Sequence, residues 1–194
     1  MSTGAASTGP ASLVRTWLRV LGRPRTFFGR TVVSGNQGRG LVFGMAVVAV
    51  EEATRLVLVG GAAPVVGGQR VLSGLLWLGV ATLLVAPVAL HLLAAVQTAI
   101  LMPTVPDRGA ASETVQVLGY ATAPSVFAGL PVPEVRVVVA AWGAVLLALG
   151  TAQVHDLGFE SAAAVSAVPS ALLFGYGFRG FDALATLLSR WYVI

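Results

Sequence analysis

Long apolar stretches alternate with short polar connections along most of this sequence. Runs of about 20 apolar residues are long enough to cross a bilayer as a helix, and such runs recur here. They predict an all-α, polytopic membrane fold, because a helix satisfies its own backbone hydrogen bonds in lipid. The five predicted spans lie within a membrane domain at 41–177 and cover about 41–61, 72–102, 114–130, 135–153 and 161–177.

Two of these spans depart from a plain transmembrane helix. At 1.5 Å per residue, the run at 72–102 would reach about 46 Å, more than a ~30 Å hydrocarbon core. It must therefore tilt, kink at Pro87 or project beyond the membrane. The run at 114–130 is short and holds Pro124, so it is predicted to be bent.

The segment before the first span divides into two parts. Residues 1–11 are small and polar and are predicted to be disordered. Within 12–40, apolar side chains recur at helical spacing between arginines, which predicts a basic amphipathic helix on the membrane surface. Pro24 should end this helix near Gly22. The predicted contacts with the membrane surface are Arg15, Trp17, Arg19 and Arg23.

Aromatic residues extend this interpretation to both ends of the chain. Phe27 and Phe28 are predicted to anchor the N-terminal segment by inserting, with Trp17, into the membrane interface. The alternative is that this segment packs on the protein's own loops. Residues 178–194 predict a second interfacial helix, with Trp191 and Tyr192 at the level of the lipid headgroups.

Composition and charge agree with a membrane protein. The chain is 56% hydrophobic and 10% charged, against about 25% charged residues in soluble domains, which excludes a soluble fold and makes nucleic-acid binding unexpected. Basic residues before the first span favour a cytoplasmic N-terminus, hence an outside C-terminus, in the cell membrane. These residues are Arg15, Arg19, Arg23, Arg25, Arg30 and Arg39.

Three charges interrupt the first span. Glu51, Glu52 and Arg55 each cost about 2.5–3.5 kcal/mol at membrane depth, so the bundle must compensate them. Arg55 lies three and four residues from the two carboxylates and can pair with either. The remaining carboxylate is expected to be protonated, hydrogen-bonded or hydrated, and His91 in the second span is its predicted partner. Such a cluster either locks the bundle or relays protons.

The candidate chemistry beyond this cluster is sparse. Only two histidines and no cysteine occur, so no metal site and no cofactor are expected. No serine lies in a nucleophile motif such as G-x-S-x-G. We therefore expect no enzymatic activity.

Small residues at four-residue spacing predict where helices pack closely. The fifth span carries such a ladder, which is expected to form an intramolecular seam, with a homodimer face as the alternative. The first span opens with Gly40-x-x-x-Gly44. The residues of the ladder are Ala163, Ala167, Ala171 and Gly175.

Eight positions between the N-terminal segment and the end of the fourth span form an ordered set: Pro24, Phe27, Phe28, Tyr120, Pro124, Trp142, Gly150 and His155. Taken in order, they resemble the Yip (Ypt-interacting protein) domain family, most closely its prokaryotic branch as found in halophilic archaea. The resemblance covers roughly residues 20–180. It implies five spans, a cytoplasmic N-terminus and no enzymatic chemistry.

The resemblance also implies a role in shaping membrane or binding partners. Eukaryotic relatives bind lipid-modified small GTPases, but the Asp-Leu-x-Gly-Pro motif of those relatives is missing here. We expect a non-enzymatic protein that organises membrane or scaffolds partners: the bilayer with its anionic lipids, and a membrane protein or a second copy. The alternative is a small proton-coupled transporter or channel that uses Glu51, Glu52, Arg55 and His91.

Overall fold

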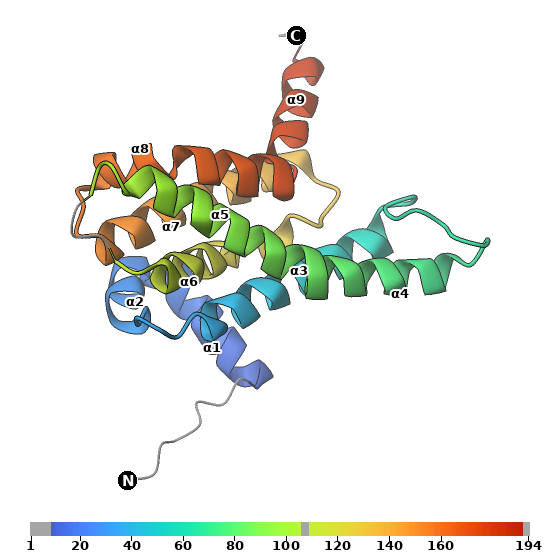
Figure 1. Cartoon of the computed structure of the whole chain (residues 1–194). Coiled ribbons are helices and arrows are strands. Elements are labelled where there is room, and N and C mark those ends of the chain that lie inside the picture. Colours follow the sequence, from blue (N-terminus) through green and yellow to red (C-terminus); the bar gives the residue numbers. More distant parts are fainter. Residues whose placement is uncertain (1–8, 106–108, 192–194) are drawn as a thin grey trace.

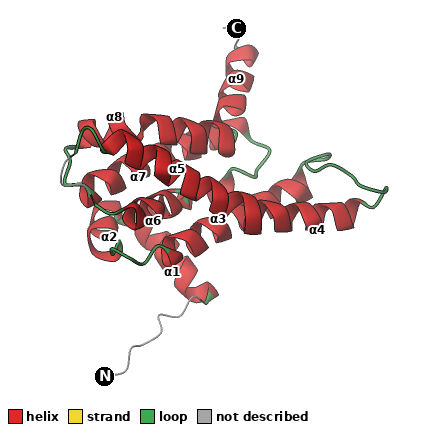
Figure 2. Cartoon of the chain, viewed as in Figure 1, coloured by secondary structure: helices red, strands yellow, loops and turns green. Residues whose placement is uncertain are grey.

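Helices form nearly all of the regular structure in the computed structural model, which describes residues 9–105 and 109–191 (Figures 1 and 2). Within these two ranges no strand occurs, so the all-α prediction is confirmed. The elements are α1 (Pro10–Gly22), α2 (Pro24–Thr31), α3 (Gly38–Leu58), α4 (Arg70–Val80), η1 (Ala81–Val85), α5 (Ala86–Leu101), α6 (Ala111–Ala121), η2 (Ala123–Phe127), α7 (Pro133–Val154), α8 (Phe159–Ser170), η3 (Ala171–Gly177) and α9 (Gly180–Arg190).

Prolines start several of these helices. Pro10, Pro24 and Pro133 occupy the first turns of α1, α2 and α7, where a missing backbone N–H costs nothing. The predicted helix break at Gly22 is confirmed, since α1 ends there and α2 begins two residues later. The predicted disorder is wrong at its C-terminal end, because α1 already begins at Pro10. Residues 1–8 lie outside the described residues.

Two described helices are long and apolar enough to cross a membrane: Arg70–Leu101, which joins α4, η1 and α5, and Pro133–Val154, which is α7. A third candidate is Phe159–Gly177 with Gly180–Arg190, a pair bent by 71°. α3 is 21 residues long but carries three charges in its second half, and α6 with η2 is short. Five spans therefore remain a prediction.

The joined helix α4–η1–α5 keeps a continuous helical course past Pro87. Pro87 has no backbone N–H to donate to the preceding turn. A π-helical segment at Ala81–Val85 lies just before it and accommodates the missing hydrogen bond. With the end of α3, α4 forms a hairpin arm that extends away from the other helices (Figure 1). The outward side chains of α4 and of the adjoining η1 are apolar and exposed, and include Leu72, Leu75, Leu76, Leu83 and Leu84.

Glycines bring α3 and α6 into backbone contact. A Cβ on Gly119 would collide with the backbone of Gly40, and a Cβ on Gly44 would lie 2.8 Å from the Leu90 side chain and 3.3 Å from the Gly119 Cα. The two helices run in the same direction, because Gly40 meets Gln116 and Gly129, beyond α6, meets Glu51. The Gly40-x-x-x-Gly44 spacing thus marks a close helix crossing.

Phe27 and Phe28 face the protein, which corrects the prediction that they insert into the membrane. Phe27 and Phe28 are buried, at 6% and 1% exposed. The Trp17 Nε1–H donates to the Ala123 carbonyl at 2.7 Å, and its ring packs edge-on against Phe127. An amphipathic helix buries its apolar face equally well against lipid or protein, and here η2 and the core provide that surface. The packed alternative is therefore correct for Phe27 and Phe28, whereas Trp17 is half-buried and its contact with the membrane surface stays a prediction.

The intramolecular seam predicted for the small-residue ladder of the fifth span is wrong in register, and the alternative use of the ladder as a homodimer face stays a prediction. Ala167 is exposed, and Ala163 and Ala171 are only half-buried. The buried side of α8 is one residue earlier and contains Ala162, Ser166 and Pro169. Gly175 is buried, but against Phe181 of α9, where the chain bends, and not in a helix seam.

Buried hydrogen bonds explain that register. The Gln97 side-chain amide of α5 donates to the Thr151 hydroxyl of α7 at 2.7 Å and to the Ser166 hydroxyl of α8 at 3.3 Å. Ser166 in turn donates to Thr151 at 3.1 Å. All three residues are essentially inaccessible. Rotating α8 to bury its alanines would remove Ser166 from this network and leave a buried polar group unpaired.

Candidate functional site

The charged cluster of α3 is the main polar site at depth in the bundle. Glu52 is buried and receives two hydrogen bonds from Arg55, one from Nε at 2.8 Å and one from a terminal guanidinium nitrogen. The Trp77 Nε1–H of α4 donates to the same carboxylate. This three-residue group confirms that Arg55 pairs with a neighbouring carboxylate, and it ties α4 to α3 through the tryptophan.

Glu51 has a partner from the other end of the chain. Its carboxylate forms an ion pair and hydrogen bond with the Arg179 guanidinium. Arg179 lies between η3 and α9 and adopts a left-handed backbone conformation, with φ of 58°. That conformation marks the bend between the two helices and positions the guanidinium against α3.

The two pairs balance the charge of the cluster. Two carboxylates, Glu51 and Glu52, meet two guanidinium groups, Arg55 and Arg179. Both carboxylate side chains are 5% exposed, so the loss of either partner would leave a charge with little access to water. Breaking a buried pair in this way costs about 3–5 kcal/mol. The arrangement therefore fixes α3, α4 and the start of α9 relative to one another.

A third arginine supports the same region without joining an ion pair in the described residues. Arg136 of α7 donates to the carbonyls of Ala128 and Leu130, each at 3.1 Å. Between those residues Gly129 packs on the Glu51 carbonyl, so closely that a Cβ there would collide with it. Arg136 thus holds the turn that covers the buried end of the cluster.

A cavity of about 230 Å³ adjoins the cluster. The four charged residues and Trp77 contribute to its wall, and apolar side chains from α3, α5 and η3 complete it. Its lining therefore combines charged and apolar side chains. Glu52 already accepts three hydrogen bonds, from Arg55 and Trp77, whereas Glu51 accepts one from Arg179 and keeps acceptor capacity toward the cavity.

His91 does not belong to the cluster, which corrects the predicted contact with the spare carboxylate. Its Nδ1 lies 2.7 Å from the Pro87 carbonyl on its own helix, and its side chain is exposed. The spare carboxylate finds Arg179 instead. One signal in the sequence could have identified this partner: in a five-span alternation the ends of the first and fifth spans lie at the same face.

Four of the family-motif positions meet in one packed cluster. The Tyr120 ring lies edge-on to Phe27, with centroids 4.9 Å apart, and Phe27 packs in turn on Phe28. Gly150 of α7 makes room for this arrangement, because a Cβ there would lie about 3 Å from the Phe28 ring. The cluster joins α2, α6 and α7, so these positions support the fold and provide no chemical site.

The remaining motif positions have separate surroundings. Pro124 is buried in η2, and Pro24 opens α2. Trp142 is 38% exposed on α7. His155 is buried after the end of α7, where its Nδ1 accepts a hydrogen bond from the Gly109 N–H at 3.0 Å. Pro24, Pro124 and His155 thus lie at helix ends or turns, whereas Trp142 lies on a partly exposed face in the middle of α7.

Metal binding has no support in the described part of the chain, where no three His, Cys, Asp or Glu side chains are grouped to hold an ion. The absence of a metal or cofactor was expected from the sequence and stays a prediction. The arginines predicted to touch the membrane surface, Arg15, Arg19 and Arg23, are all exposed. Their contact with lipid also stays a prediction.

Comparison with known proteins gives one match. The family model described as the Yip1 domain matches residues 18–178, which is most of the chain. No curated protein and no solved structure matches the sequence.

Proposed function

This chain belongs to the Yip1 domain family, and on that premise we propose that it is a non-enzymatic integral membrane protein that organises membrane or scaffolds partner proteins. In this proposal it lies in the cell membrane, with a cytoplasmic N-terminus and an outside C-terminus. The arginines before α3 favour that orientation. Its partners would be the bilayer, including anionic lipids, and another membrane protein or a second copy.

One observation carries this proposal: the strongest polar groups of the bundle bind each other, while its outward chemistry is apolar. Glu51 and Glu52 are paired with Arg179 and Arg55. The hairpin arm, by contrast, presents a row of exposed leucines on α4 and η1. A surface of this kind suits contact with lipid or with another apolar helix. Polar groups that hold the helices of the bundle together suit a scaffold.

Photo-crosslinking in native membranes tests the scaffold role directly. The chain contains no lysine, so amine-reactive reagents would miss most of it, and a photoreactive amino acid at Leu76 is the better probe. The matched control is the same group at Leu118, which is fully buried. Mass spectrometry should identify one or two proteins captured only from Leu76. Capture of lipid alone from Leu76 would contradict the role as a protein scaffold. Membrane organisation would then be the remaining part of the proposal.

The cavity beside the cluster favours a second candidate, a small proton-coupled transporter or channel. Its wall contains Glu51 and Glu52, the side chains that such a path would need. Against it, both carboxylates have arginine partners and His91 lies elsewhere. Glu51→Gln and Glu52→Gln in proteoliposomes separate the two functions. A transporter loses flux while remaining folded, whereas a scaffold shows no flux and loses stability.

A further inference from the structure

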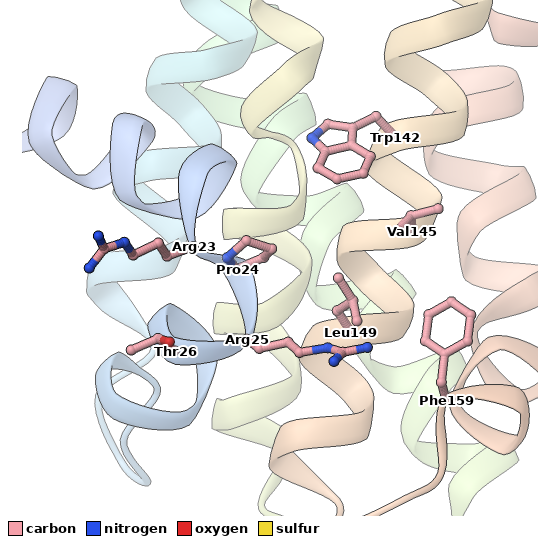
Figure 3. A pocket seen from close by; sticks show the side chains of 8 residues that line it. All are labelled: Arg23, Pro24, Arg25, Thr26, Trp142, Val145, Leu149 and Phe159. Carbon is pink, nitrogen blue, oxygen red and sulfur yellow. The ribbon is translucent and has the colours of Figure 1, made fainter.

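An open groove of about 500 Å³ lies between the α1–α2 junction and α7, beside the start of α8 (Figure 3). It belongs neither to the charged cluster nor to the aromatic core. Its size falls within the ~300–1,000 Å³ range of small-molecule sites. The groove is lined by Arg23, Pro24, Arg25, Thr26, Trp142, Val145, Leu149 and Phe159.

The chemistry of the groove changes along its length. Trp142, Val145 and Leu149 lie on one face of α7, at three- and four-residue spacing, and form an apolar wall. The seven residue steps from Trp142 to Leu149 correspond to about 10 Å along the helix. Arg25 reaches across from α2 at the level of Leu149 and directs its guanidinium toward α7, close to Phe159 (Figure 3). One end is therefore cationic and the other is hydrocarbon.

Arg25 is free to bind a ligand. It is exposed, and in the described residues no ion pair or hydrogen bond engages its guanidinium. Arg23 also borders the groove, but its side chain points away from α7 (Figure 3). The two aromatic residues of the wall, Trp142 and Phe159, are 38% and 45% exposed, so apolar surface is left uncovered beside an unused cation.

We propose that this groove binds one anionic phospholipid, with its phosphate at Arg25 and one acyl chain along Leu149, Val145 and Trp142. A guanidinium binds phosphate oxygens through paired N–H donors. α7 is long and apolar enough to cross a membrane, and the cationic end of the groove lies toward its C-terminal end. Phosphate at that end and hydrocarbon deeper along α7 match the order of groups in a bilayer leaflet.

The surrounding charge selects an anionic headgroup over a zwitterionic one. Five further arginines precede or open α3, and no acidic residue occurs in the sequence before Glu51. A positive potential of this kind attracts a lipid with net negative charge and repels a choline ammonium. Glu160 follows Phe159 but does not line the groove. Arg25 was not among the residues predicted from the sequence to contact the membrane surface.

Native mass spectrometry of the full chain tests the site. The detergent-purified protein is titrated with phosphatidylglycerol, phosphatidylcholine and, separately, soluble glycerol phosphate. Arg25→Gln should weaken phosphatidylglycerol binding about tenfold. The matched control is Arg30→Gln, which removes the same charge from an exposed position of the same helix, about 140° around its axis, and should leave binding unchanged. Trp142→Ala should weaken the lipid but not glycerol phosphate.

Three results would overturn the proposal. Equal losses in Arg25→Gln and Arg30→Gln would reduce the effect to general attraction between the basic segment and anionic lipid. Unchanged binding in Arg25→Gln would exclude the groove. Glycerol phosphate bound as tightly as phosphatidylglycerol would show that the acyl chain has no place there. Thermal unfolding of each variant, expected to match the unmodified protein, shows that the fold is intact.

Discussion

The two halves of α3 are held in the bundle by different means. Its first half contacts α6 through Gly40 and Gly44, where the two backbones approach too closely for any side chain. Its second half carries Glu51, Glu52 and Arg55, which are joined to α4 and α9 by ion pairs and hydrogen bonds. Helices in lipid gain no hydrophobic advantage from meeting. This helix shows both remaining means of association, close packing and polar pairing, within 21 residues.

The largest expected effect comes from blocking the close-packed half. In Gly119→Leu the new side chain would collide with the backbone of Gly40, and the backbone cannot move aside as a flexible side chain can. We expect a loss of about 4 kcal/mol or more, enough to prevent folding. Thermal unfolding in detergent measures it. The control is Gly74→Ala on α4, where a Cβ meets nothing within 4 Å, and which should gain up to about 1 kcal/mol.

Breaking the long-range pair of the charged half should cost less. Arg179→Gln leaves Glu51 buried without its cation, but the Arg179 side chain is 26% exposed, so water compensates part of the loss. We expect about 2–3 kcal/mol, below the range for a fully buried pair. The double variant with Glu51→Gln should recover part of it, giving a coupling free energy of about 1–2 kcal/mol. Strictly additive losses would mean that the pair does not contribute.

The link from α3 to the hairpin arm is weaker still. Trp77→Phe keeps most of the apolar volume and removes only the Nε1–H that donates to Glu52. We expect a loss of about 1.5–2 kcal/mol, the lower part of the range for one hydrogen bond to a charged acceptor, because Arg55 still pairs with Glu52. Limited proteolysis in the 59–69 loop should also accelerate, because α4 loses its polar attachment. Unchanged stability together with unchanged proteolysis would contradict this role of Trp77.

The smallest effect is expected at His91. Its ring bonds only to the Pro87 carbonyl in the described residues and is exposed, so His91→Gln should change the free energy of unfolding by less than about 0.5 kcal/mol. Unfolding measured alone and in the Glu51→Gln background checks this. A coupling free energy above about 1 kcal/mol between the two positions would show that His91 interacts with the charged cluster after all.

Features that depend on neighbours along the chain were predictable from the sequence. The helix break at Gly22 follows from Pro24, and the long second helix follows from an uninterrupted apolar run. The pair of Glu52 and Arg55 follows from three-residue spacing on one helix. Gly40 and Gly44 marked a close crossing because only glycine removes the side chain from a helix surface. In each case the physical cause lies within a few turns of backbone.

The partner of each outward side chain was not predictable in the same way. Apolar faces look alike whether lipid or protein covers them, so Phe27 and Phe28 were expected in the membrane and lie in the core. Alanine spacing predicted a buried face of α8 that is one residue out of register, because the hydrogen bonds of Ser166 decide how the helix is rotated. Arg179 lies 128 residues from Glu51, and no local pattern joins them.

The sequence by itself determined a helical membrane protein and the approximate position of its long apolar helices. It also showed that α3 carries charges at membrane depth that need partners. Hydrophobicity and helical spacing are properties of consecutive residues, and they are sufficient for that much. Only the tertiary structure decided how the charge is balanced, through Arg179 and Trp77, and where an unused cation, Arg25, faces an apolar groove. Both features depend on which helices lie side by side. Ion pairs and packing contacts join residues that are close in space but far apart in the sequence, so the order of residues alone does not reveal them.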